Sequence, residues 1–383
     1  MIVVLSIMLL APLSLSAAVF HVHTLDGLEN ALHAAQDNGE DDTINVGEGH
    51  YTVAGTLTYH STEDHGITIE QAAGPVTIDG NGGWRILEIW AFGNADVTIK
   101  GVAFVDGFVS DDTAACLSVR TQFGNITLED VQVRDGRAGS LFGSANAGGA
   151  FVRIENTGTI LIKDCTFANN YAKGIGGGLY VVGGMGTTVN LVNNVLYANQ
   201  ANTQGGGLYL NLIDGDATLT NNTFTNNTTG YGSGGGGIFL SLYLDTATAG
   251  LYNNIIWGNR AENGIGEDLY LEDDGNGNDM GVSVQIQNND YGDVDAHSGS
   301  HVTASDNIDQ SPLLAGGARL LRNSPCIDRG TAAAPNLPLE DFEGDPRSLD
   351  GNDDTTVIPD MGADEYRYVP QKPFSASLFL ILL

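Results

Sequence analysis

The chain has 383 residues, 52 of them glycine, and it carries 47 acidic against 15 basic side chains, a formal net charge of −32. This excess of negative charge argues against nucleic acids and anionic membrane surfaces as partners, because both would repel the protein. The many glycines favour short strands joined by tight turns. The three cysteines lie too far apart to indicate a disulfide framework or a metal site, so we expect small buried side chains at Cys116, Cys165 and Cys326.

The first segment, residues 1–18, is apolar and ends in Ser16-Ala17-Ala18. Small residues at this place suit signal-peptide cleavage before Val19, which predicts export. A buried first strand is the alternative interpretation, because no Lys or Arg precedes the apolar core. The segment is too short for a transmembrane helix.

The second segment, residues 19–66, contains one helical pattern, at residues 26–38, with Asp26 in a position to cap it. A single amphipathic helix before an array of strands predicts a cap over the open end of that array. The residues that would share its apolar face are Leu28, Ala31, Leu32 and Ala35.

After this helix, residues 42–46 form a short strand pattern and residues 47–49 a turn pattern. Asp42-Thr43-Ile44 and Gly49-x-Tyr51, together with the helical face, resemble the opening of many secreted bacterial β-helix proteins. The resemblance implies an exported β-helix.

Between residues 67 and 308 the sequence repeats, and the first, third and eighth positions of each repeat are apolar. Equivalent side chains should therefore stack in columns about 4.8 Å apart. A period of about 30 residues with short strands and no helix predicts an all-β, right-handed parallel β-helix with three sheets. A propeller, the main competitor, needs longer blades of four antiparallel strands. The repeats start at Val97, Ile126, Ile160, Val189, Ala217, Ala249 and Val284.

Asparagines and glycine runs recur once per repeat. Asparagine tolerates a left-handed backbone and its amide can bond along a stack, so a structural role at the corners between sheets is the preferred interpretation. The glycine runs indicate corners, since no phosphate-loop motif surrounds them. The Asn-Asn pairs begin at Asn193, Asn221, Asn253 and Asn288, and a second set is Asn170, Asn199, Asn227 and Asn259.

Part of the repeat region carries two patterns that alternate. Phe167-Ala168-Asn169-Asn170 and Phe224-Thr225-Asn226-Asn227 match FxxN, and Gly148-Gly149-Ala150-Phe151 and Gly177-Gly178-Leu179 match a GGA[ILV]-like run. These residues resemble the repeats of polymorphic outer-membrane proteins among bacterial surface adhesins. The resemblance implies a secreted or surface β-helix and says little about its ligand.

The segment 309–366 carries motifs in a fixed order. They are Ser311-Pro312-Leu313, Ser324-Pro325-Cys326-Ile327-Asp328, Asp341-x-x-Gly344-x-Pro346-Arg347 and Asp360-Met361-Gly362-Ala363-x-Glu365-Tyr366. The series resembles the closing module of the choice-of-anchor Q family of secreted bacterial β-helix proteins. Its Pro, Gly and Asp punctuation predicts an irregular module packed over the last repeat. By the same resemblance, we expect the tail, residues 367–383, to be a sorting or anchoring tag in a degenerate form. The tail is too short to span a bilayer.

The candidate catalytic residues are Asp106, Asp135 and Lys163. The two aspartates occupy equivalent turn positions on successive repeats, where a cation or a sugar could bind, and Lys163 belongs to an outward column of alternating charge. A hydrolase needs paired carboxylates, and a lyase of this fold needs a base beside carboxylate-bound Ca²⁺. No His-centred or paired-Asp motif surrounds the three residues.

Calcium is the one cofactor for which the sequence offers candidate ligands. The runs Asp350-x-Asn352-x-Asp354 and Asp274-x-Asn276-x-Asn278 have the oxygen spacing of calcium loops. Both lack the sixth-position Gly and the twelfth-position Glu of such loops.

Two functions fit these observations. We favour a non-catalytic secreted or cell-surface scaffold for adhesion or carbohydrate binding, whose partner is an extracellular glycan or a host- or cell-surface component. The alternative is a polysaccharide lyase or glycoside hydrolase of the pectate-lyase-like type. Acid, base and aromatic side chains gathered on one face of consecutive repeats would indicate the enzyme, and the pattern does not show them. The sequence does not set the oligomeric state or name the ligand.

Overall fold

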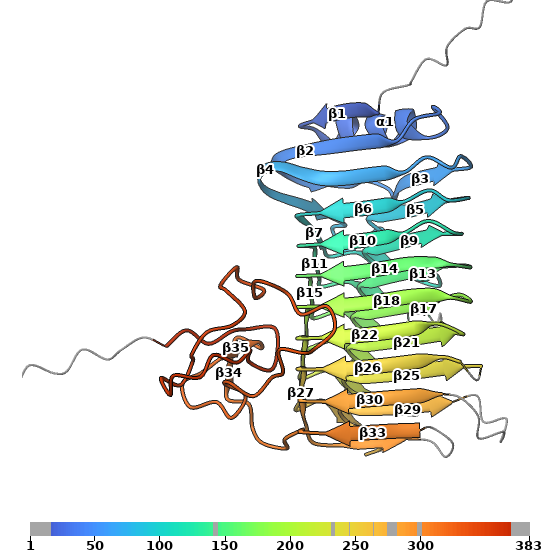
Figure 1. The fold of residues 1–383 in the computed structure, drawn as a ribbon. Coiled ribbons are helices and arrows are strands. Elements are labelled where there is room, and N and C mark those ends of the chain that lie inside the picture. Colours follow the sequence, from blue (N-terminus) through green and yellow to red (C-terminus); the bar gives the residue numbers. More distant parts are fainter. Residues whose placement is uncertain are drawn as a thin grey trace, which may run out of the picture.

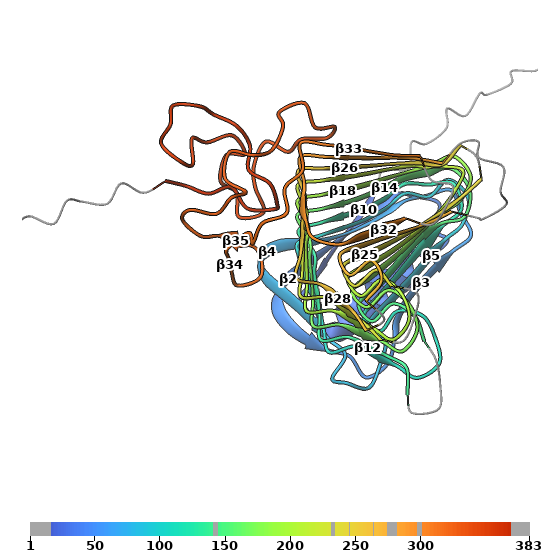
Figure 2. The same cartoon turned by 90° about the horizontal axis from the view of Figure 1, so that it is seen from below.

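The computed structural model describes residues 17–140, 145–230, 234–244, 246–262, 264–273, 282–296 and 301–368. Parallel strands coil around one axis, and the C-terminal residues lie against one side of the coil (Figure 1). Seen along the axis, the strands stack behind one another in walls around a common interior (Figure 2). The predicted all-β parallel β-helix is confirmed.

Two of the parallel sheets make up most of the coil. The 18-stranded sheet contributes two strands to most turns and contains β1 (Ala18–Val22), β2 (Asp42–Thr52), β4 (Ile67–Asp79), β6 (Val97–Lys100), β7 (Val102–Val105), β10 (Ile126–Glu129), β11 (Gln132–Arg134), β14 (Gly158–Lys163), β15 (Thr166–Ala168), β18 (Thr187–Val192), β19 (Val195–Tyr197), β22 (Asp216–Thr220), β23 (Thr223–Thr225), β26 (Thr248–Tyr252), β27 (Ile255–Trp257), β30 (Ser283–Gln287), β31 (Asp290–Tyr291) and β33 (His301–Ser305). The 9-stranded sheet contains β3 (Leu57–Ser61), β5 (Leu87–Ala91), β9 (Leu117–Thr121), β13 (Ala150–Ile154), β17 (Leu179–Gly183), β21 (Leu208–Ile213), β25 (Ile238–Tyr243), β29 (Leu269–Asp273) and β32 (Val294–Ala296).

Two smaller sheets complete the strands. The 6-stranded parallel sheet contains β8 (Phe108–Val109), β12 (Arg137–Ala138), β16 (Tyr171–Ala172), β20 (Gln200–Ala201), β24 (Thr228–Thr229) and β28 (Arg260–Ala261). Near the C-terminus, β34 (Leu314–Ala315) and β35 (Arg319–Leu320) form an antiparallel pair.

The predicted columns are present in register. The first positions of successive repeats pair without a shift from Val97 in β6 to Val284 in β30. The eighth positions pair likewise from Phe104 in β7 to Tyr291 in β31. These inward side chains form one continuous apolar core along the coil. Burial of this apolar surface is the main force that holds the turns together.

The helix α1 (Leu25–Ala35) lies at the N-terminal end of the stack and packs against β1, β2 and β3 (Figure 1). It ends at Ala35 rather than at Asn38. The predicted cap at Asp26 is wrong, because Thr24 has the extended backbone of an N-cap and its hydroxyl accepts a hydrogen bond from the Gly27 amide at 3.1 Å. The predicted apolar face is buried, at Leu28, Ala31, Leu32 and Ala35.

The solenoid begins earlier than predicted. Ala18 and residues 19–22 form β1, which pairs in parallel with β2. Residues 47–49 are not a turn but part of β2, where the pairing with β4 shifts register around Gly47. The predicted signal peptide lies mostly in residues 1–16, outside the described residues, as does most of the predicted C-terminal tag.

The second asparagine of each pair forms an internal ladder at the corner within the large sheet. The Asn194 side-chain amide donates to the Ile162 carbonyl at 2.8 Å and to Asn222 Oδ1 at 2.9 Å. The same contacts recur in the turns that follow, and Asn194, Asn222, Asn254 and Asn289 are buried, so the structural interpretation is confirmed. The ladder continues through Asn222, Asn254, Asn289 and Asn307, and a second ladder runs from Asn170 through Asn199, Asn227 and Asn259 to Asp268.

The C-terminal module, residues 309–368, does not pack over the last repeat as predicted but lies along the flank of the solenoid (Figure 1). The first asparagine of each pair points outward at the corner and donates its amide to a backbone carbonyl of the module. Asn193 donates to Glu340 at 2.7 Å, and Asn221 donates to Asp360 at 2.9 Å. Asn253 and Asn288 donate likewise to Thr331 and Arg329.

Candidate functional site

The structure places Asp106 and Asp135 at equivalent corners of successive turns, as predicted. Both have a left-handed backbone, with φ of 55° and 60°. The Asp106 amide donates to the Arg134 carbonyl at 3.1 Å, so each aspartate is part of the turn-to-turn hydrogen bonding. The Asp135 carboxylate lies 2.8 Å from the Arg134 guanidinium. These contacts explain the two aspartates as corner residues.

Lys163 makes its contacts elsewhere, at the end of β14. Its ammonium lies 3.0 Å from Asp164 and 3.7 Å from Glu129, which also pairs with Lys100 at 2.9 Å. Burial alone would lower the pKa of Lys163, but the two carboxylates raise it above its usual value. A protonated lysine in a charge ladder is poorly suited to act as a base. Lys163 forms no ion pair with Asp106 or Asp135.

The predicted calcium loops have different outcomes. Residues 274–278 lie outside the described residues. In the other loop, Asp350 accepts the amides of Asp354 and Thr355 at 3.0 and 2.8 Å, and Asn352 accepts the Asp354 amide at 2.9 Å. In the described part of the chain, no group of three or more His, Cys, Asp and Glu residues could hold a metal ion. Calcium binding stays a prediction.

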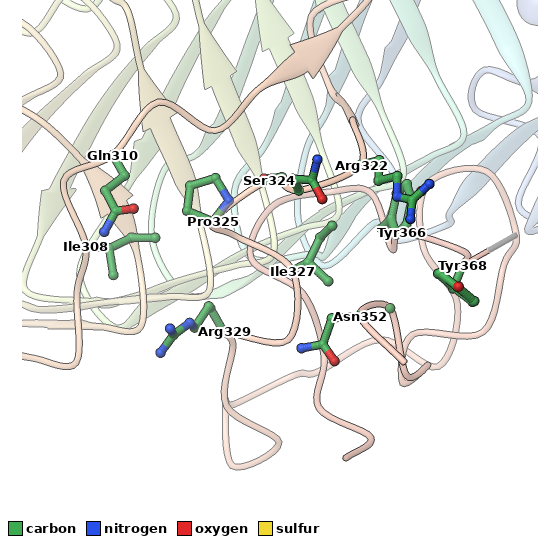
Figure 3. Close-up of a pocket in the computed structure, with 12 residues that line it drawn as sticks. Ile308, Gln310, Arg322, Ser324, Pro325, Ile327, Arg329, Asn352, Tyr366 and Tyr368 are labelled. Atoms are coloured by element: carbon green, nitrogen blue, oxygen red, sulfur yellow. The ribbon is translucent and has the colours of Figure 1, made fainter. Parts of the chain in front are cut away.

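A cavity of about 680 Å³ lies between the C-terminal module and the end of the solenoid, and we call it the C-terminal pocket. Figure 3 shows its side chains, with Arg322 and Arg329 on different sides of Ile327. The wall contains two arginines, two tyrosines and three side-chain amides, and among the described residues no Asp, Glu, His or Lys lines it. The lining residues are Ile308, Gln310, Arg322, Asn323, Ser324, Pro325, Ile327, Arg329, Gly351, Asn352, Tyr366 and Tyr368.

The turn that carries both arginines is held by two buried contacts, one within the module and one to the solenoid. The Ser324 hydroxyl donates to the Pro312 carbonyl at 2.6 Å. The buried Cys326 thiol lies 3.1 Å from Asp290 Oδ2, in β31 of the last turns, and donates to it. Burial raises the pKa of the Cys326 thiol and raises that of Asp290 to about 6. The expectation of buried cysteines is confirmed for all three, which are unpaired.

Buried carboxylates hold the opposite wall. Asp328 accepts the Asn352 amide at 3.1 Å, and Asp360 accepts the amides of Asp328 and Tyr366, both at 2.6 Å. Glu365 accepts the Asp360 amide at 2.9 Å. Burial raises the pKa of Asp360 and of Glu365, because the protein interior disfavours their charged forms. The pocket is therefore built on fixed loops.

The charges in the pocket are unbalanced. The other arginines of the module have acidic partners, since Arg319 pairs with Glu343, Arg347 with Glu365 and Arg367 with Asp345. Arg322 and Arg329 are exposed and form no ion pair with any residue that the structure describes. In a chain with net charge −32, the wall of this cavity therefore contains two guanidinium groups without a carboxylate partner among the described residues.

Reasoning from the sequence did not find this pocket. The available signal was the spacing of Arg322 and Arg329, which flank the Ser324–Asp328 motif in a chain with only 15 basic residues. The cavity itself could not be predicted, because Ile308 reaches it from the end of the solenoid.

A second feature that was missed is an aromatic stack on the outer face of the nine-stranded sheet. Neighbouring ring centroids lie 4.9 to 5.2 Å apart. Phe239 and Tyr209 are 0% and 6% exposed, so their ring faces are covered and the stack supports the fold rather than a sugar. The signal in the sequence was an aromatic residue at the second position of each of these strands. These residues are Phe151, Tyr180, Tyr209, Phe239 and Tyr270.

Comparison with known proteins shows the fold alone. No family model and no curated protein matches the chain. The crystal structure of the pectate lyase Pel9A matches with a TM-score of 0.52 and 15% identity, and covers 91% of this chain and 96% of its own. The PL6 family polysaccharide lyase Pedsa3628 from Pseudopedobacter saltans has a TM-score of 0.28 and 13% identity, covering 85% and 98%. Within the described residues, no helix is long and apolar enough to cross a membrane.

Proposed function

We propose that this protein is a non-catalytic, secreted or cell-surface β-helix protein that binds anionic glycans in its C-terminal pocket. The observation that carries the proposal is the pair of unpaired guanidinium groups of Arg322 and Arg329 in a cavity of about 680 Å³. Guanidinium groups bind carboxylates and sulfates through two parallel hydrogen bonds. The volume lies in the range of ligand pockets, about 300–1,000 Å³.

The remaining side chains of the pocket suit a sugar. Gln310, Asn323 and Asn352 offer amide donors and acceptors for hydroxyl groups, and Tyr366 and Tyr368 offer aromatic surface. The pectate lyase that shares the fold is named for an anionic polysaccharide. Export and a surface location, as the choice-of-anchor Q resemblance implies, would bring such a pocket into contact with extracellular glycans.

The same lining supports binding rather than cleavage. Hydrolysis of a glycosidic bond needs two carboxyl groups about 5–10 Å apart. A calcium-dependent lyase needs carboxylates to hold the ion. The lining of the pocket has neither, and Asp328 below it is buried and engaged by the Gly351 and Asn352 amides.

A glycan array carrying uronate-containing, sulfated and neutral oligosaccharides tests the proposal. We expect the wild-type protein to retain anionic glycans, and the double variant Arg322→Gln/Arg329→Gln to bind them at least tenfold more weakly. Arg319→Gln is the matched control, since Arg319 lies in the same module but is paired with Glu343. Absence of anionic ligands, or equal binding by the double variant, would refute the proposal.

The non-catalytic part has its own test. Purified protein is incubated with acidic polysaccharides and Ca²⁺, and the absorbance of unsaturated sugar products is followed. We expect no product. If product forms and is lost in Asp135→Ala, the protein is a polysaccharide lyase and the non-catalytic part of the proposal is wrong.

A further inference from the structure

A second cavity lies near the other end of the solenoid, at the loop between β4 and β5. Its volume is about 360 Å³, and we call it the Trp84 groove. It runs beside β8, the end strand of the six-stranded sheet. Seven strand steps of the nine-stranded sheet separate β5 from β32 at the other end of that sheet, or roughly 34 Å at about 4.8 Å per step. Its lining residues are Thr56, Gly83, Trp84, Arg85, Phe108, Val109, Ser110, Asp111 and Asp112.

The walls of the groove are held in place by Arg85, whose side chain is 7% exposed. Its guanidinium donates to the carbonyls of Ala114 and Thr113 at 3.1 and 2.9 Å, and also binds Asp112. The Phe108 amide donates to the Trp84 carbonyl at 2.9 Å. The two loops that form the groove are thus tied to each other, so a ligand would meet a preformed surface.

Trp84 differs from the other two tryptophans of the chain. Trp90 stacks on Phe92 at 4.8 Å, and Trp257 packs against a buried cluster. Trp84 is 49% exposed and belongs to none of the hydrophobic clusters of the described residues. Its ring lies beside Phe108 and Val109 in the lining of the groove, where a ligand could reach it.

The polar groups around this ring are acceptors rather than cations. Burial by itself would raise the pKa of Asp112, but the Thr113 amide and the Arg85 guanidinium lower it below the usual value, so this carboxylate is ionised. Asp111 is exposed and has no hydrogen bond or ion pair with the residues that the structure describes. The guanidinium of Arg85 is occupied, so the groove presents net negative charge and would repel an anionic ligand.

We infer that the Trp84 groove binds a neutral pyranose unit of a glycan. The C–H groups of one sugar face carry a slight positive charge and pack on the electron-rich face of the indole ring. The hydroxyl groups at the edge of the sugar donate to the Asp111 carboxylate and to the Ser110 hydroxyl. This site is independent of the C-terminal pocket, and both together would bind a mixed glycan chain at two points, which strengthens attachment.

Isothermal titration with neutral cello-, xylo-, manno-, galacto- and malto-hexaose tests the inference on the full chain. We expect at least one hexaose to bind, and Trp84→Ala to weaken that binding at least tenfold. Asp111→Asn should weaken it less, since an amide oxygen still accepts a hydrogen bond. Phe123→Ala, which removes another aromatic side chain that is 46% exposed, is the matched control and should bind like the wild type.

Two outcomes would overturn the inference: no hexaose binds the wild-type protein, or Trp84→Ala binds it equally well while its melting temperature is unchanged. The double variant Arg322→Gln/Arg329→Gln should bind neutral hexaoses normally. This variant separates the two proposals, because it alters only the C-terminal pocket. If it loses anionic glycans but keeps neutral hexaoses, the two ligands bind at different sites.

Discussion

The solenoid and the C-terminal module satisfy the hydrogen-bonding groups of their backbones in different ways. In the solenoid, each strand pairs with the strand of the next turn, and neutral Asn194 and its equivalents complete the corners. The module has one short antiparallel pair of strands. Its other backbone groups form hydrogen bonds with acidic and basic side chains, such as Asp341, Asp360 and Arg347. The repeated corners of the solenoid are occupied by these structural contacts, whereas the C-terminal pocket lies beside the buried polar side chains of the module.

The contrast extends to neighbouring residues. Asn221 and Asn222 have the same chemistry and adjacent places in the chain. The backbone of Asn221 is left-handed, with φ of 54°, and its side chain faces the module. Asn222 faces inward and joins the ladder. The corner geometry, not the residue type, assigns the two roles.

The largest effect should come from Arg347, which is 1% exposed. Its guanidinium donates to the carbonyls of Gly362, Ala363 and Asp364 at 3.1, 2.7 and 3.2 Å. Arg347→Met would remove the donor to the Ala363 and Asp364 carbonyls and the ion pair with Glu365, so we expect the module to lose about 3–5 kcal/mol of stability. Hydrogen exchange measured separately for module and solenoid checks this.

The control for Arg347 is Arg319→Met, which removes an exposed ion pair and should cost less than about 1 kcal/mol. Equal protection of the module in both variants would contradict the role of Arg347 in holding the backbone of the module together. Unfolding of the whole solenoid in Arg347→Met would contradict the separation of the two regions.

The asparagine pair offers a sharper comparison. Asn222→Ala removes bonds to Leu191 and Asn254 and leaves Asn194 without its acceptor, so we expect a loss of about 2–3 kcal/mol in the solenoid. Asn221→Ala removes two bonds to the module and the acceptor of the Asn253 amide, and it should cost less, about 1 kcal/mol. Hydrogen exchange of β18 to β26 measures both, and reversal of the two effects would refute the assignment.

The pH dependence should differ between the regions as well. Burial raises the pKa of Asp364 and of Asp290 to about 6. A raised carboxyl pKa means that the folded state binds the proton more tightly, so this stability is present in acid and is lost as pH rises through about 6. We expect the module and its contact with β31 to lose on the order of 2 kcal/mol between pH 5 and pH 8.

Denaturation followed by hydrogen exchange at both pH values tests this dependence. Asp364→Asn keeps an oxygen for the Leu320 amide, which lies 2.7 Å from Asp364 Oδ2, but it cannot ionise. The variant should therefore show a flatter profile than the wild type. A module that becomes more stable as pH rises would show that the sign is wrong.

Most of the fold could be predicted from the sequence because a repeat states the same constraint many times. The column from Val97 to Val284 has seven members, one per repeat, and each member confirms the register of the others. The place of the module could not be predicted, because it depends on which way Asn193 and Asn221 point. In the site, Asp106 and Asp135 looked functional since they are charged and recur, but left-handed corners favour Asp and Asn for structural reasons.

The central claim is that anionic glycans bind in the C-terminal pocket rather than at the repeat residues Asp106, Asp135 and Lys163. Isothermal titration with the strongest anionic oligosaccharide of the array tests it, on the wild type, Arg322→Gln/Arg329→Gln and Asp106→Asn/Asp135→Asn/Lys163→Met. We predict that the pocket variant loses at least tenfold in affinity, about 1.4 kcal/mol, and that the repeat variant binds like the wild type. Normal binding by the pocket variant with loss in the repeat variant would contradict the account.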